Sequence, residues 1–180
     1  MNHNIYTVCL IGNPDTGKSS LLNAYLDLPL ANEVTVFANI RSIRTYFKRG
    51  DLEKLIKLRI VDTAGQERYT SVMPSIIYRE AHLGIIVFDL SEPSSLEGLD
   101  RRIRNFVDSA REEVILVLVG NKQDINTTRS ELADRMINDR IKQLTHDHLI
   151  TFYIQTSART KHNVDLLFEQ IACLLDSVYP

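Results

Sequence analysis

The stretch GNPDTGKSS, from Gly12 to Ser20, decides how the rest of the chain is interpreted. It follows the apolar run IYTVCLIG (5–12) and precedes SLLNAYL, which has a helical pattern. Strand, glycine-containing loop and helix, in this order, are the context in which the pattern G-x-x-x-x-G-K-[ST] binds phosphate. Backbone N–H groups and a helix N-terminus then face a phosphate chain, with Lys18 at the outer phosphates and Ser19 at Mg²⁺. The alternative is a chance glycine turn beside a buried lysine.

Short apolar runs rich in β-branched residues recur on both sides of this loop. They are nearly continuous rather than alternating, which is typical of strands covered on both faces of a parallel sheet. Such runs predict strands at 5–12, 55–62, 83–90, 114–120 and 149–155, and an exposed strand at 38–50 that forms a hairpin with the run at 55. Helical patterns lie between them, and the last two span 128–148 and 164–178.

This alternation predicts a single α/β domain over residues 1–180. The expected sheet has six strands, mostly parallel, with one antiparallel edge strand and about five helices distributed over both faces. Ligands bind sheets of this kind beyond the carboxyl ends of the strands. Polar residues that directly follow a predicted strand are therefore the candidates for chemistry.

Composition excludes several classes of protein. The net charge of −2 over 180 residues gives no general attraction to nucleic acid. No apolar run approaches the ~18 residues of a membrane span, and the N-terminus lacks the basic region of a signal peptide, so we expect a cytoplasmic protein. Cys9 and Cys173 both lie in apolar runs, which predicts two buried thiols in a reducing compartment.

The strand at 55–62 ends in the motif DTAGQER (62–68). Asp62, at the end of a strand beside a phosphate loop, is placed to hold Mg²⁺ through its water shell. Gly65 allows a backbone N–H to approach a γ-phosphate, and Gln66 can orient an attacking water. Taken alone, this motif is also a plausible polar turn.

Two motifs follow the next strands, NKQD at 121–124 and TSAR at 156–159. The carboxylate of Asp124 can accept two N–H bonds from the edge of guanine, which adenine does not offer, and an unpaired buried carboxylate rejects the wrong base strongly. A backbone N–H near Ala158 can meet the guanine carbonyl. Each motif taken singly also fits a loop that caps a helix.

With these four motifs in order, the chain resembles a small GTPase of the Ras superfamily, over nearly its whole length. The resemblance implies the P-loop NTPase G domain fold. VTVFAN (34–39) resembles the first switch of Rho proteins, whereas RYTSVMPSIIYREAH (68–82) resembles the second switch of Rab proteins. We favour a Rab-like protein, with a divergent member between the two groups as the alternative.

The resemblance also implies roles for individual residues. Lys18, Thr35 and Gln66 would serve catalysis, with Thr35 as the first-switch threonine in preference to Thr45. Ser19, Thr35 and Asp62 would hold Mg²⁺. GTP or GDP would be bound by Asn13, Pro14, Asp15, Thr16, Gly17, Lys18, Ser19, Ser20, Thr35, Gly65, Asn121, Lys122, Asp124, Ser157, Ala158 and Arg159, with Lys122 packed along the base.

The chain departs from the family pattern at several points. Pro14 occupies a position that is glycine in many relatives, and it lacks an N–H close to where Gln66 must act. Asp15 adds a carboxylate near an anionic ligand, which is unfavourable unless it points to solvent. Tyr25 falls within a predicted helix, so Leu28 or Leu30 would have to cover the guanine instead of an aromatic side chain.

The function implied is a GTP/GDP switch that hydrolyses GTP slowly, in vesicle trafficking or related membrane and cytoskeletal signalling. Partners would be effectors at two switch loops, about 29–39 and 64–80, an activating protein that supplies an arginine in trans, and an exchange factor. The C-terminal IACLLDSVYP has no cysteine at a lipidation position. We therefore expect attachment to the cytosolic face of membranes only through a tail outside this chain. The protein is also expected to be a monomer.

Two other functions stay open at this stage. Pro14, Asp15 and the missing aromatic favour a GTP-binding scaffold that does not hydrolyse its nucleotide. An adenine-nucleotide phosphotransferase could use the same phosphate loop, although Asn121 and Asp124 argue against it.

Overall fold

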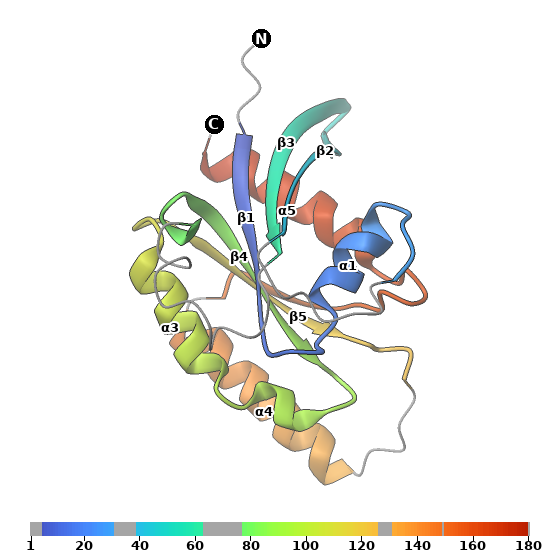
Figure 1. The fold of residues 1–180 in the computed structure, drawn as a ribbon, viewed down its shortest axis with the longest axis vertical. Helices are drawn as coiled ribbons and strands as arrows, with labels where there is room; N and C mark the ends of the chain where they lie inside the picture. Colours follow the sequence, from blue (N-terminus) through green and yellow to red (C-terminus); the bar gives the residue numbers. More distant parts are fainter. Residues whose placement is uncertain (1–4, 31–38, 63–76, 126–130, 149, 180) are drawn as a thin grey trace.

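One six-stranded sheet organises the computed structural model, which describes residues 5–30, 39–62, 77–125, 131–148 and 150–179. The strands lie in the order β2-β3-β1-β4-β5-β6, with β1 at the centre (Figure 1). β2 is an edge strand and pairs antiparallel with β3, whereas every other neighbouring pair is parallel. The strands are β1 (Ile5–Ile11), β2 (Asn39–Arg49), β3 (Leu52–Asp62), β4 (Ala81–Asp89), β5 (Ile115–Asn121) and β6 (Phe152–Gln155).

The helices follow the strands as the alternating pattern predicts. Within the described residues the elements with defined bounds are α1 (Lys18–Tyr25), the 3-10 helix η1 (Pro93–Leu96), α3 (Leu99–Ser109), α4 (Glu131–Asp147) and α5 (Val164–Val178). α1 and α5 cover one face of the sheet, and α3 and α4 cover the other. The predicted α/β class and the mostly parallel sheet with one antiparallel edge strand are confirmed.

Alternate residues of each central strand enter different cores. In β1, Val8 and Leu10 pack toward α1 and α5, while Cys9 and Ile11 pack toward α3 and α4. This period of two is what a strand buried on both faces requires, and it explains the continuous apolar runs in the sequence. Burial raises the pKa of the Cys9 thiol to about 12, so this cysteine is unreactive, as expected for a core residue.

Several expectations about burial are wrong. Cys173 is exposed rather than buried, because it lies on the side of α5 that faces away from the sheet. The strand at 149–155 is shorter than predicted, and β6 is only half-buried, since it forms the edge of the sheet.

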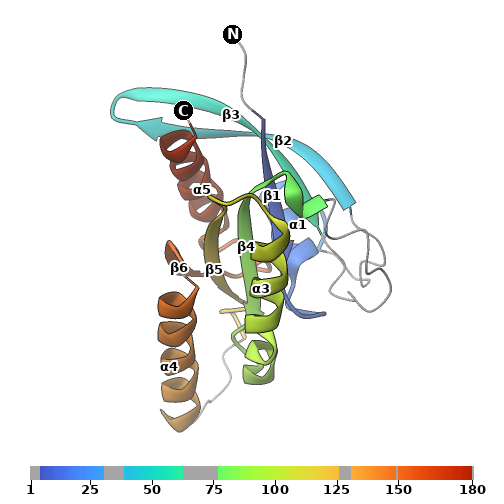
Figure 2. The same cartoon turned by 90° about the vertical axis from the view of Figure 1, so that its left-hand side faces the viewer.

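The hairpin of β2 and β3 extends along α5 (Figure 2) and has two different faces. On the α5 side, Arg49 and Lys54 both contact Asp176, at 2.9 and 2.8 Å. On the opposite side, Arg44 stands directly across from Lys57, and Arg59 lies two residues further along β3, on the same face as Lys57. None of these three cations is ion-paired with a described residue.

No helix among the described residues is long and apolar enough to cross a membrane.

Candidate nucleotide-binding site

The loop between β1 and α1 is built on two glycines that cannot carry a side chain. A Cβ added to Gly12 would lie 2.1 Å from the Val87 carbonyl oxygen of β4. A Cβ added to Gly17 would lie 2.4 Å from Asn121 Nδ2, and the residue has φ +87°. The first glycine therefore lets the loop pass over the neighbouring strand, and the second lets it approach the loop after β5.

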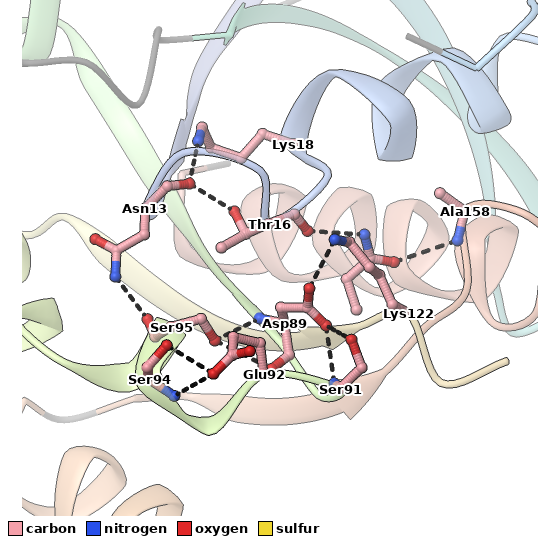
Figure 3. A network of polar contacts seen from close by, with 11 residues as sticks. Asn13, Thr16, Lys18, Asp89, Ser91, Glu92, Ser94, Ser95, Lys122 and Ala158 are labelled. Carbon is pink, nitrogen blue, oxygen red and sulfur yellow. Dashed lines mark hydrogen bonds and ion pairs between the residues drawn. The ribbon is translucent and has the colours of Figure 1, made fainter. Parts of the chain in front are cut away.

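Lys18 begins α1, and its ammonium points back into this loop (Figure 3). Its Nζ donates to the carbonyl oxygens of Gly12 at 3.1 Å and Asn13 at 2.8 Å, and the side chain of Thr16 donates to the same Asn13 oxygen at 3.0 Å. Lys18 is only 6% exposed. A buried positive charge is thus held at the centre of the loop, which favours an anionic ligand there.

The two unusual residues of the loop both face outward. Pro14 and Asp15 are exposed, and Asp15 adopts φ +61°. The exposed position of Asp15 meets the condition under which its carboxylate is tolerated beside an anionic ligand. Thr16 and Lys18, by contrast, are buried on the inner side of the loop.

The Asn13 side chain fastens the loop to the segment after β4. Its Nδ2 donates to the carbonyl oxygens of Ser95 at 2.8 Å and Glu97 at 3.0 Å, and its Oδ1 accepts from Arg102 Nε at 2.7 Å. These contacts occupy both ends of the amide. Asn13 was predicted to bind nucleotide; its side chain binds the protein instead, which leaves its backbone for any contact with a ligand.

Asp62 ends β3 close to the start of α1. It is 3% exposed; burial raises the pKa of its carboxyl, while a hydrogen bond from Ser19 and the charges of Lys18 and Arg41 act in the opposite direction. Its Oδ1 is buried and accepts no hydrogen bond from a described residue. A buried carboxylate oxygen without a protein partner, next to a serine hydroxyl, fits a hydrated Mg²⁺.

Asn121, the last residue of β5, ties three loops together. Its Nδ2 donates to the Thr16 carbonyl at 3.0 Å, and its Oδ1 accepts from Thr156 Oγ1 and from the Ala158 backbone N–H, both at 3.2 Å. Asn121 is 1% exposed. The loops after β1, β5 and β6 are therefore joined at one buried amide, as the rule for carboxyl ends predicts.

The next residues of this motif are also fixed by neighbours. Asp124 Oδ1 accepts from Ser157 Oγ at 2.6 Å, and Ser157 Oγ also accepts from the Thr160 N–H at 3.0 Å. Lys122 has φ +63°, and its Nζ lies 2.6 Å from Asp89 Oδ2. Asp124 is thus oriented from the loop after β6, and Lys122 from the end of β4.

The segment after α1 lies beside these loops. Tyr25 stacks on Phe168 at 4.0 Å between ring centroids and donates to Thr45 Oγ1, so it belongs to the core and not to a ligand site. Asp27 pairs with Lys161 at 2.5 Å. Leu28 and Leu30 are 44% and 37% exposed, as residues free to cover a ligand must be.

Most of the predicted site can be located. Loop 12–20, Asp62, Asn121–Asp124 and Ser157–Ala158 meet at the carboxyl edge of the sheet, with Arg159 exposed at its margin. Thr35, Gly65 and Gln66 lie outside the described residues, so their roles stay predictions.

Asp89 and Ser95 were not predicted from the sequence. Asp89 ends the buried run of β4 just as Asp62 ends that of β3, and it is 7% exposed. An acidic residue directly after a buried strand was the signal that could have found it.

Comparison with known proteins covers nearly the whole chain. The model of the Ras family matches residues 7–176. The chain is 32% identical over 169 residues to the Ras-related protein Rab-11A of Dictyostelium discoideum, covering 93% of this chain and 74% of that protein. It is 33% identical over 175 residues to the Ras-related protein Rab-30 of Homo sapiens, covering 96% of this chain and 81% of that protein.

Proposed function

The chain belongs to the Ras family as a Rab-like small GTPase, and from this premise we propose how its residues bind GTP and GDP, hydrolyse GTP and act as a switch in vesicle trafficking. The observation that carries the proposal is the junction at Asn121. One buried amide joins the loop around Lys18 to the two loops that would hold the base. Phosphates and base would therefore be read by parts of a single connected site.

Lys18 and the loop backbone would bind the phosphates. The ammonium already lies inside the loop, and backbone N–H groups at the start of α1 add the positive end of a helix dipole. Ser19 and Asp62 would hold Mg²⁺, together with Thr35. When bound, the metal neutralises phosphate charge during hydrolysis.

Asp124 would read the guanine edge, and the Ala158 N–H would meet its carbonyl. Ser157 supports this proposal because its hydroxyl fixes one oxygen of Asp124 at 2.6 Å, which orients the carboxylate before a base arrives. Because the carboxylate is already oriented, less conformational entropy is lost when the base binds. Adenine would leave this carboxylate unpaired.

Gln66 would position the attacking water, and Thr35 and Gly65 would sense the γ-phosphate. Intrinsic hydrolysis is expected to be slow, because Arg102, the described arginine in contact with the phosphate loop, directs its Nε to Asn13. An arginine supplied by an activating protein is worth about 10³–10⁵ in rate in such systems.

The bound nucleotide would set the conformation of two loops, about 29–39 and 64–80, and effectors would bind the GTP-bound form. The sheet between these loops is the β2–β3 hairpin. Its outer face carries Arg44, Lys57 and Arg59 without acidic partners among the described residues, in a chain whose net charge is −2. This local excess of positive charge favours effectors with an acidic surface.

A second candidate is a GTP-binding scaffold that does not hydrolyse. Pro14 favours it, because proline removes an N–H from the phosphate loop. The outward position of Asp15 argues against it, since that carboxylate does not oppose the ligand.

The experiment that tests the proposed binding is competition against a fluorescent GDP analogue in the presence of Mg²⁺. GTP and GDP should displace the analogue at concentrations far below those at which ATP does. Equal displacement by ATP would contradict the base assignment, and a failure to bind the analogue at all would contradict the proposed function.

A further inference from the structure

We propose that Asp89 is a positioning residue for the guanine loop, and that the segment Asp89–Glu97, here called the β4 turn, controls how long the nucleotide stays bound. This inference rests on the proposed nucleotide site and adds a regulatory element to it. The β4 turn lies between the phosphate loop and the base loop and contacts both (Figure 3).

The first contact fixes Lys122. Asp89 Oδ2 lies 2.6 Å from Lys122 Nζ, while Asp89 Oδ1 accepts from the Ser91 N–H at 2.8 Å and from Ser91 Oγ at 2.6 Å. Both carboxylate oxygens are therefore used, and the group cannot rotate without losing a bond. The side chain of Asp89 is 9% exposed, and that of Lys122 is 31% exposed.

The consequence concerns the aliphatic part of Lys122. Because the ammonium is held at its far end, the four-carbon stem is stretched in one direction and presents a fixed apolar surface. This stem is the part expected to pack along the base. The backbone of Lys122 also lies in the left-handed region, which is strained for a residue other than glycine. A fixed side chain helps to hold the residue in this conformation.

The second contact reaches the phosphate loop. Ser95 Oγ accepts from the Asp89 N–H at 2.9 Å and donates to the Asp89 carbonyl at 3.0 Å. The carbonyl of the same Ser95 accepts from Asn13 Nδ2. A continuous path of hydrogen bonds, ending in one ion pair, thus leads from Asn13 through Ser95 and Asp89 to Lys122.

This path differs from the junction at Asn121. Asn121 joins the loops from the inside, through Thr16 and Ala158. The β4 turn joins them from the outside, through Asn13 and Lys122. Loosening the turn would let both loops move apart while Asn121 stays in place, so we infer that the turn acts on nucleotide release.

The test measures dissociation of a fluorescent GDP analogue from the full chain in Mg²⁺. Asp89→Asn should accelerate release roughly tenfold, because it removes the negative charge that holds the Lys122 ammonium. Lys122→Met, which keeps the aliphatic length but not the charge, should accelerate it similarly. In the double variant the two effects should not add, because both remove the same interaction.

A pair of neighbouring serines provides the control. Ser95→Ala removes the hydroxyl that is hydrogen-bonded to both the N–H and the carbonyl of Asp89. The loss of these two hydrogen bonds should accelerate release several-fold. Ser94→Ala removes a hydroxyl of the same turn that, among the described residues, forms a hydrogen bond to Glu92 and not to the path from Asn13 to Lys122, and this variant should release at the rate of the unchanged chain.

Each outcome decides between explanations. Release from Asp89→Asn at the unchanged rate would overturn the inference while leaving the proposed function intact. Additive effects in the double variant would show that Asp89 does not act through Lys122, as a general loss of stability would produce. A chain that never binds the analogue would instead contradict the proposed function.

Discussion

At the scale of single residues, the site depends on a few buried polar side chains whose oxygen and nitrogen atoms all have partners. Asn121 uses both ends of its amide, and Asp89 uses both carboxylate oxygens. Such groups are costly to leave unpaired, so they fix one arrangement of the loops. Asp124 differs, because Ser157 fixes one of its carboxylate oxygens, Oδ1. The carboxylate of Asp124 is the group expected to face the base.

The first prediction concerns Asp124. Asp124→Asn replaces an acceptor of two N–H bonds by an amide that can donate to a carbonyl, so the preference should move from guanine toward xanthine nucleotides. We expect GTP to lose at least roughly a hundredfold in affinity relative to xanthosine triphosphate, since buried polar mismatches discriminate strongly. Competition against the fluorescent analogue measures this ratio. An unchanged ratio would mean that Asp124 does not read the base.

At the scale of elements, the β2–β3 hairpin is stabilised on one face and strained by charge on the other. Arg49 and Lys54 both form ion pairs with Asp176 of α5, and their hydrogen bonds to it lower the pKa of its carboxyl. Arg44 and Lys57 stand opposite each other without an acid between them. Like charges in directly opposed positions of a sheet are destabilising.

The second prediction compares the two faces by the same charge reversal. Lys57→Glu creates a pair with Arg44 and should raise the free energy of unfolding by about 0.5 kcal/mol. Lys54→Glu breaks the contact with Asp176 and should lower it, by up to about 1 kcal/mol at this partly exposed site. Urea unfolding at fixed GDP measures both. If both variants lost stability equally, the two faces would not differ as described.

The elements also show what the sequence could and could not predict. Continuous apolar runs predicted five of the six strands, because burial on both faces leaves a clear pattern, whereas β2 was predicted as the exposed strand of a hairpin. The position of Cys173 on its helix could not be assigned, since an apolar residue at the flank of a helical stripe is compatible with either side. The contacts of Asn13 with Ser95 and Glu97 join residues more than eighty positions apart, and no local pattern reveals such a pairing.

At the scale of the whole molecule, the pole opposite the nucleotide site is closed by aromatic and histidine side chains. His82 lies at an irregularity between β1 and β4, and its Nδ1 accepts the Thr7 N–H at 3.0 Å. Its ring stands edge-on to Tyr6 and Tyr179, at 5.4 and 5.1 Å between centroids. The end of the chain is thereby attached to the centre of the sheet.

The third prediction follows from the neutral state of His82. Burial lowers the pKa of this imidazole below its ordinary value of 6.5, and the charge of Arg111 acts in the same direction, while Glu80 opposes them. Above that pH the ring is neutral whether the chain is folded or unfolded, and the contact contributes fully. As the pH falls through 6.5, the unfolded chain takes up the proton first, so stability should decrease.

Urea unfolding between pH 7.5 and 5.5, at constant GDP, measures this loss. His82→Gln should reduce the pH dependence, whereas His146→Gln, at a side chain that is 90% exposed on α4, should keep it. Equal slopes for the unchanged chain and His82→Gln would place the titrating group elsewhere.

The central claim is that the chain is a switch that hydrolyses the GTP it binds. The measurement that tests it most directly is a single-turnover assay: the chain is loaded with GTP and Mg²⁺, and phosphate release is followed beside the variants Gln66→Leu and Pro14→Gly. We expect slow release, on the order of 10⁻⁴ per second without an activating protein, that is lost in Gln66→Leu. GTP that stays bound and intact, with turnover only in Pro14→Gly, would contradict it and identify a scaffold.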